Sequence, residues 1–191
     1  MVRIAISTLT AVLFLQVAFA QSPFKNKKDE KFYNKIDNFY VEGEYEKILD
    51  NEEAILTYVE GREDTVAAVM NFFLGDAYLL IYNDLETSVD FFRKEYELRK
   101  KAGHKDEAFT QAAFNLGYSL DELGYFSETE AIYLELLEVE KDNNGVKSIE
   151  YYQSATSLLD HYTFTNEYDK GLSLVKKLKR NVEDNTRSEE A

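Results

Sequence analysis

Apolar residues recur along this chain at intervals of three and four, in blocks that short polar segments separate. Between residues 113 and 137, a first block places its apolar side chains at Ala113, Leu116, Leu120 and Leu123. A break at Gly124 follows, and the second block contains Phe126, Ile132, Tyr133, Leu136 and Leu137. These intervals put each block on one face of an α-helix rather than on a strand. The pattern therefore predicts two antiparallel helices joined at Gly124.

The same pattern returns with a period of about 42 residues, and such self-similarity is typical of repeat proteins. Gly117 in FNLGYSL lies one period after Gly75 in FFLGDAYLL, and one further period leads to Leu159. A second marker, an aromatic residue or leucine that opens the next helix, recurs at nearly the same interval at Tyr45, Leu85, Phe126 and Tyr168. The markers predict helix pairs near residues 30–42 with 45–59, 64–82 with 86–102, 105–123 with 127–141, and 147–164 with 168–180.

Two glycines lie seven residues apart in the third unit, in a segment that is otherwise rich in helix formers. A glycine inside a helix costs about 1 kcal/mol relative to alanine, so each position needs a reason. We expect Gly124 to lie in the turn between the helices, where a positive φ favours glycine. We expect Gly117 to lie inside the first helix, where the missing side chain lets the partner helix approach closely.

The residues at these markers resemble those of the tetratricopeptide repeat (TPR). In the third unit they are Leu116-Gly117 and Leu120 in the first helix, Gly124-Tyr125-Phe126 at the turn, and Tyr133 in the second helix. The period is similar to that of the longer, kinesin-light-chain-like repeats rather than to the usual period of about 34 residues. The resemblance covers about residues 30–180. It implies an all-α fold, an α-α superhelix of about four antiparallel helix pairs, whose concave groove binds a peptide or partner helix.

The two ends of the chain differ from this repeat region. Arg3 is followed by an uncharged, largely apolar run from Ile4 to Ala20, which ends in the small residues that a signal peptidase requires. Residues 1–20 are therefore predicted to be a cleaved signal peptide, with a retained membrane anchor as the alternative. The predicted mature chain has a polar leader (21–29), the repeat domain (30–180) and a polar, disordered tail (181–191). We expect it to be exported, to the periplasm or the medium, without stable membrane insertion after cleavage.

The charge of the chain excludes some classes of partner. The formal net charge is −14 at pH 7, from 22 basic and 36 acidic residues. Such a chain repels the phosphates of nucleic acids, so nucleic-acid binding is not expected. Cysteine is absent, which excludes disulfides and thiolate metal sites. The single proline and the eight glycines favour long helices over a β-sandwich rich in turns.

No pattern in the sequence points to catalysis, a metal or a cofactor. The histidines, His104 and His161, are distant in sequence and lack the convergent ligands of a metal site. No serine stands in a G-x-S-x-G elbow. The histidines are expected to be surface or packing residues. An extracytoplasmic hydrolase is the least favoured of the three functional interpretations.

The expected binding groove is defined by positions on the first helix of each unit. The ninth position of that helix reads Asp37, Asp76, Tyr118 and Asp160 in successive units. Asn115 lies close to this column, and Phe73, Phe114 and Phe164 are expected to be exposed on the concave side. Three carboxylates in one column would form a negative stripe. The hypothesis is a groove for a basic or neutral segment, and the alternative is a generally acidic surface.

A further interpretation concerns assembly. Repeat arrays need a polar cap at each end, because a terminal repeat otherwise leaves an apolar face uncovered. After the fourth pair the sequence shows no further amphipathic helix that would cover Leu172, Leu174 or Leu178. The sequence therefore also allows a structural subunit that forms homo-oligomers through its last repeat.

Overall fold

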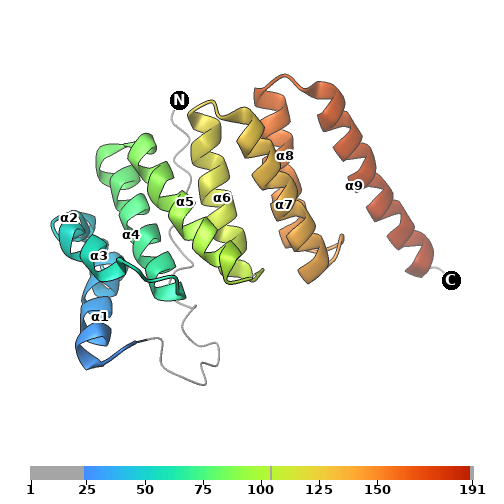
Figure 1. The fold of residues 1–191 in the computed structure, drawn as a ribbon. Helices are drawn as coiled ribbons and strands as arrows, with labels where there is room; N and C mark the ends of the chain where they lie inside the picture. Colours follow the sequence, from blue (N-terminus) through green and yellow to red (C-terminus); the bar gives the residue numbers. More distant parts are fainter. Residues whose placement is uncertain (1–23, 104, 190–191) are drawn as a thin grey trace.

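The computed structural model describes residues 24–103 and 105–189, which form helices joined by short turns, without a strand among them (Figure 1). The helices are α1 (Lys27–Val41), α2 (Tyr45–Leu49), α3 (Glu52–Val59), α4 (Thr65–Tyr82), α5 (Leu85–Lys101), α6 (Glu107–Glu122), α7 (Phe126–Asn144), α8 (Ile149–Phe164) and α9 (Tyr168–Glu189). The predicted signal peptide (1–20) lies outside the described residues, as does His104.

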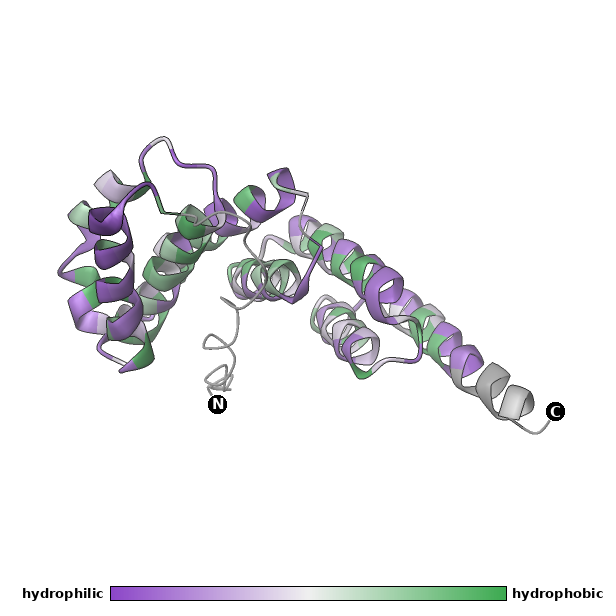
Figure 2. Cartoon of the chain, turned by 90° about the horizontal axis from the view of Figure 1, so that it is seen from below, coloured by the Kyte–Doolittle hydropathy of each residue, from purple (hydrophilic) through white to green (hydrophobic). Residues whose placement is uncertain are grey.

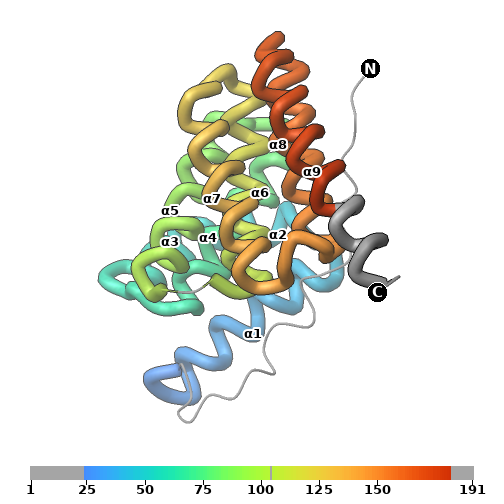
Figure 3. Tube along the Cα trace, turned by 90° about the vertical axis from the view of Figure 1, so that its right-hand side faces the viewer, coloured from blue at the N-terminus to red at the C-terminus, as the bar shows by residue number. Residues whose placement is uncertain are grey.

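The helices stack in chain order, and from α4 onward each packs on the one before it. Contacts join α4 to α5, α5 to α6, α6 to α7, α7 to α8 and α8 to α9. Viewed from below, the array follows an arc that ends in α9 (Figure 2). Viewed from the α9 end, the successive pairs lie behind one another (Figure 3). This arrangement confirms the predicted all-α superhelix of antiparallel helix pairs.

The first pair differs from the prediction in its second helix. Residues 45–59 form two helices, because the chain breaks at Asn51, which has φ −104° and ψ 9°. The Asn51 side-chain amide donates to the Lys47 carbonyl at 2.7 Å and accepts from Lys35 Nζ at 2.8 Å. An asparagine that bonds to nearby backbone competes with the helix ladder, which accounts for the break.

The boundaries at both ends also differ from the prediction. Helix α1 begins at Lys27, inside the predicted leader (21–29), because the Asn26 side chain accepts from the amides of Lys28 and Asp29 and caps the helix. Helix α9 continues to Glu189, across most of the predicted disordered tail (181–191). No glycine or proline follows Gly171, so nothing in the local sequence stops the helix at residue 180.

The structure confirms the roles expected of the two glycines. Gly124 has φ +83° in the turn between α6 and α7. A Cβ atom at Gly117 would lie 2.5 Å from Cε1 of Tyr133 on α7, so only glycine allows this contact. One repeat earlier, a Cβ at Gly75 would lie 2.7 Å from Cε1 of Phe92. In both pairs a glycine on the first helix receives an aromatic ring from the second.

The fourth pair has no glycine at the position of Gly117. Leu159 occupies the place of Gly117, and the glycine is on the second helix instead, at Gly171. A Cβ at Gly171 would lie 3.9 Å from Cδ2 of Leu159, an ordinary van der Waals distance. Because Gly171 lies one period after Thr129 rather than after Tyr133, the fourth pair lacks the contact between a first-helix glycine and a second-helix aromatic ring.

The core extends from one pair to the next. One group of buried apolar residues joins α1–α5, and a second joins α5–α9. Phe72 packs against both groups and links them. By length and composition, α4 could cross a membrane, with a mean hydropathy of 1.5. It packs against α2, α3 and α5, and this burial explains its apolar composition.

Candidate partner-binding cleft

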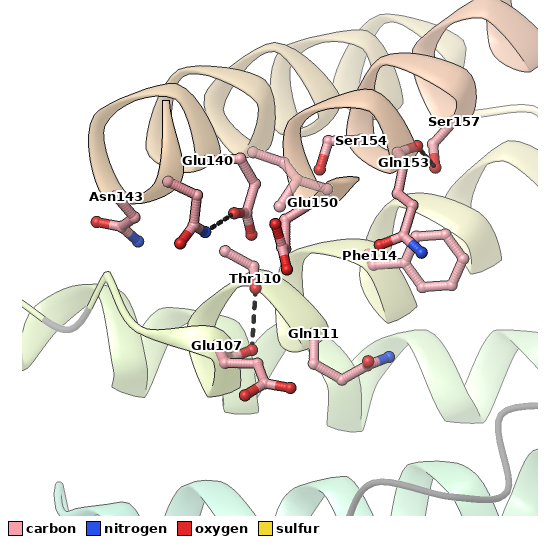
Figure 4. Close-up of a pocket in the computed structure, with 12 residues that line it drawn as sticks. Glu107, Thr110, Gln111, Phe114, Glu140, Asn143, Glu150, Gln153, Ser154 and Ser157 are labelled. Atoms are coloured by element: carbon pink, nitrogen blue, oxygen red, sulfur yellow. Dashed lines mark hydrogen bonds between the residues drawn. The ribbon is translucent and has the colours of Figure 1, made fainter. Parts of the chain in front are cut away.

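A cleft of about 610 Å³ opens between α6, α8 and the C-terminal end of α7 (Figure 4). It lies on the side formed by the first helices of the third and fourth pairs. Its lining residues are Glu107, Thr110, Gln111 and Phe114 from α6, Leu136, Glu140, Asn143 and Asn144 from α7, and Glu150, Gln153, Ser154 and Ser157 from α8.

Helical spacing places these side chains on facing sides of α6 and α8. The sets are Glu107, Gln111 and Phe114 on α6, and Glu150, Gln153 and Ser157 on α8, at intervals of three and four residues. Both helices have a side-chain N-cap: Asp106 accepts from the Phe109 amide at 3.0 Å, and Ser148 accepts from the Tyr151 amide at 3.1 Å. The rim of the cleft is therefore built on regular, capped helices rather than on loops.

The lining of the cleft is negative and rich in amides. The described residues of the lining include the carboxylates of Glu107, Glu140 and Glu150 and no lysine or arginine side chain. Glu140 is only 6% exposed, and its Oε2 accepts a hydrogen bond from Asn144 Nδ2 at 2.6 Å. Four amide side chains can both donate to and accept from a peptide backbone. Phe114 supplies an apolar surface at one end.

Of the residues predicted from the sequence, only Phe114 lines this cleft, and Asn115 and Tyr118 are its neighbours on α6. Phe114 lines it and is partly buried, and its ring stacks on that of Tyr118 with centroids 6.4 Å apart. Asn115 is the next residue on α6 and accepts from Gln111 Nε2 at 2.8 Å. The three predicted residues are therefore neighbours on one helix, with Phe114 alone in the lining of the cleft. Its role in binding stays a prediction.

Two of the predicted residues are not accessible. Phe73 was expected to be exposed but is 2% exposed, with its ring stacked on Tyr40 at 4.5 Å. Asp76 is 7% exposed, and its Oδ2 accepts from the Tyr40 hydroxyl at 2.8 Å. Both predictions of accessibility are wrong because α1 covers this side of α4. In the register of the repeat, Phe114 corresponds to Phe72 rather than to Phe73.

The remaining predicted residues lie away from the cleft. Asp37 is half-buried on α1, where burial raises the pKa of its carboxyl. Asp160 is exposed on α8, and Phe164 is 61% exposed at the end of that helix, edge-on to the Phe126 ring at 5.7 Å. With Asp76 buried, the expected stripe of three carboxylates is not continuous. The carboxylates that line the cleft are Glu107, Glu140 and Glu150, none of which belongs to the predicted column.

The sequence contains one pattern that could have indicated the cleft, a pair of glutamines at the same position of two repeats. Gln111 and Gln153 are one repeat period apart, so the repeat places an amide at the same position of α6 and α8. They lie earlier on their helices than the ninth position used for the prediction. Glu140 and Asn143 come from a second helix, and only the packing of α7 against α6 and α8 brings them to the same space.

His161 has a packing role in the structure. It is 1% exposed, with Nδ1 2.7 Å from Oδ1 of Asp121 on α6 and its ring edge-on to Tyr133. The bond ties α8 to α6 across the third and fourth pairs. Among the described residues, no group of three or more histidine, cysteine or acidic side chains is arranged to hold a metal ion.

The arrangement of helices is similar to that of solved repeat proteins. Two crystal structures of a Podosopora anserina chain with nearly identical TPR-like repeats, named as a putative kinesin light chain, each match with a TM-score of 0.66 at 10% sequence identity. The fold is TPR-like. The matches cover 84% and 89% of this chain, and 77% and 80% of the respective Podosopora chains. BtubC (BKLC) from P. vanneervenii matches with a TM-score of 0.48 at 14% identity, over 76% of each chain.

No protein-family model and no curated protein sequence matches the chain. The TPR-like fold alone does not assign a function, because one fold can carry many different functions. A function has to be argued from the cleft.

Proposed function

We propose that this TPR-like array binds an extended segment of a partner protein in the cleft between α6 and α8. The observation that carries the proposal is the lining: three carboxylates and four amides without a basic side chain, beside the exposed part of Phe114. Amides on facing helices suit the alternating N–H and C=O groups of an extended backbone. The net charge of the lining favours a basic or neutral segment over an acidic one.

The two glutamines that face each other across the cleft test this proposal. We expect the double substitution Gln111→Ala and Gln153→Ala to weaken the binding of peptides selected on residues 21–191 by about tenfold or more, since each lost hydrogen bond contributes about 0.5–1.5 kcal/mol. Affinities are measured by fluorescence anisotropy with labelled peptides from a random library. The matched control is Asn34→Ala with Asn38→Ala, two exposed amides on α1. Equal affinities for the wild type and the glutamine variant would contradict the proposal.

Export is part of the same proposal and is supported by residues 1–20 alone. The apolar run from Ile4 to Ala20, with small residues before Gln21, has the composition of a cleaved signal peptide. Protein recovered from cells is expected to begin at Gln21. A chain that retains residues 1–20 and sediments with membranes would instead support the anchor.

A second candidate function, self-assembly, is favoured by one face of α9. Tyr168, Leu172 and Val175, at i, i+4 and i+7, are 59%, 57% and 46% exposed. Leu174 and Leu178, which were expected to lack cover, instead pack on the core, because α9 lies against α8. The exposed face is the one that a following helix would cover. The occupant proposed is α9 of a second copy.

If the protein self-assembles through α9, its molecular mass in solution should change when the exposed face of α9 is altered. We expect the wild type to reach the dimer mass at high concentration, and the double substitution Leu172→Lys with Val175→Lys to stay monomeric, since two buried apolar side chains contribute about 1.5–3 kcal/mol each. Size-exclusion chromatography with light scattering measures this. As a control, the exposed Leu80 on α4 is replaced by lysine. A wild type that stays monomeric at every concentration would exclude self-assembly.

A further inference from the structure

Glu140 is the buried acidic residue, among those described, that both lines the cleft and has no cationic partner. Among the described residues, three acidic side chains are buried: Asp76, Glu95 and Glu140. Glu95 pairs with Arg99 at 2.9 Å, and Asp76 accepts from the Tyr40 hydroxyl. Glu140 accepts only from the neutral amide of Asn144, through one of its two oxygens.

The second oxygen of Glu140 faces the cleft without a hydrogen-bond partner among the described residues. A buried carboxylate is costly unless a cation or several donors compensate its charge. The side chain of Glu150 reaches into the same space from α8, as Figure 4 shows. Two carboxylates therefore line the same space, and the described residues of the lining include no lysine or arginine.

An independent polar group points to a ligand at the same place. Ser154 lines the cleft beside Glu150 and is 7% exposed, yet no hydrogen bond to its hydroxyl is present among the described residues. Serine in a helix commonly bonds to the carbonyl four residues earlier, as Ser157 does to Gln153 at 3.4 Å. Ser154 is thus more than nine-tenths buried as a residue, while its hydroxyl is an acceptor without a partner among the described residues at the wall of the cleft.

We propose that Glu140, Glu150 and Ser154 form a subsite for one cationic side chain, a lysine or arginine, of the segment that the cleft binds. The inference rests on the proposed function and specifies its ligand. An ammonium or guanidinium group supplies only donors, and the subsite offers two carboxylates and a hydroxyl oxygen as acceptors. A carboxylate ligand would be repelled by the same groups. An uncharged side chain would leave Glu140 without a cationic partner.

The role of the negative charge in the subsite is tested by replacing both glutamates with glutamine, which has the same shape but no charge. In the double substitution Glu140→Gln with Glu150→Gln, residue 140 keeps an oxygen that accepts from Asn144. Peptides are selected from one random library on the wild type and on this variant, and each selected lysine or arginine is then replaced in turn by norleucine or citrulline. We expect one cationic position to dominate, with a loss of about tenfold or more on the wild type and less than about twofold on the variant. A second pair, Glu46→Gln with Glu53→Gln on α2 and α3, removes the same charge from exposed positions.

The outcomes separate the subsite from the proposed function. If the variant still selects peptides but no longer prefers a cation at the dominant position, and the control pair keeps that preference, the subsite is supported. If the wild type selects peptides without any preferred cationic position, the subsite is wrong while the proposed function stands. If neither protein selects peptides, the proposed function itself is wrong. An equal loss of preference in the control pair would assign the effect to net charge and overturn the subsite.

Discussion

Replacing Gly117 with alanine is expected to destabilise the fold, although alanine is the better helix former. The added Cβ would lie 2.5 Å from Cε1, 3.0 Å from Cδ1 and 3.1 Å from Cζ of Tyr133. That ring is 3% exposed and lies edge-on to His161, so it has no free space to move into. Overpacking of a dense core costs about 1–3 kcal/mol, which exceeds the gain of about 1 kcal/mol in helix propensity.

The chain contains a control for this prediction in the fourth pair. Gly171 also lies inside a helix, but a Cβ there would meet Tyr162 Cβ at 3.7 Å and Leu159 Cδ2 at 3.9 Å, without a clash. Gly171→Ala is therefore expected to stabilise by up to about 1 kcal/mol. Urea unfolding followed by circular dichroism measures both free energies. The packing account is wrong if Gly117→Ala stabilises the protein as much as Gly171→Ala does.

Most of the fold could be predicted from the spacing of apolar residues and glycines, because the same spacing recurs in each repeat. The repeat period located the helix pairs, and the φ requirement at Gly124 located a turn. The predictions were less accurate where a hydrogen bond involving one side chain determines where a helix begins or breaks. Asn26 starts α1 early through its cap, and Asn51 interrupts the second helix of the first pair.

The positions of candidate residues could be predicted only where the residues lie on the same helix. Phe114, Asn115 and Tyr118 share α6, and spacing alone groups them. Asp76 and Phe73 were misplaced because their exposure depends on α1, which is distant in sequence and covers them through Tyr40. The cleft draws on three helices at once. Its key carboxylates could be recognised only after the packing of these helices was known.

The buried acidic residues beneath α1 make the stability of the array depend on pH. Glu95 on α5 is 3% exposed, with Oε1 accepting from Arg99 Nε at 2.9 Å and Oε2 without a partner. Burial raises the pKa of Glu95 to about 7, an effect that Arg99 opposes and the charge of Asp76 reinforces. The pKa of Asp76 is itself raised by burial, against the hydrogen bond from Tyr40. The folded state therefore holds a proton on Glu95 at pH values where the unfolded chain does not.

The substitution Glu95→Gln is expected to change this pH dependence. Because the pKa of Glu95 is about 7 in the folded state and close to 4.5 when unperturbed, the contribution of Glu95 to wild-type stability is complete below pH 4.5 and is lost as the pH rises through 7. Glutamine cannot ionise, so the variant does not lose this contribution. As the pH rises from about 5 to about 8, its free energy of unfolding should therefore increase by about 2–3 kcal/mol relative to that of the wild type. Urea unfolding at both pH values measures the gain, and Glu97→Gln, an exposed position on the same helix, controls for net charge. If the stability curves of wild type and Glu95→Gln run parallel across this range, Glu95 is already ionised in the folded protein, and Arg99 rather than burial determines its state.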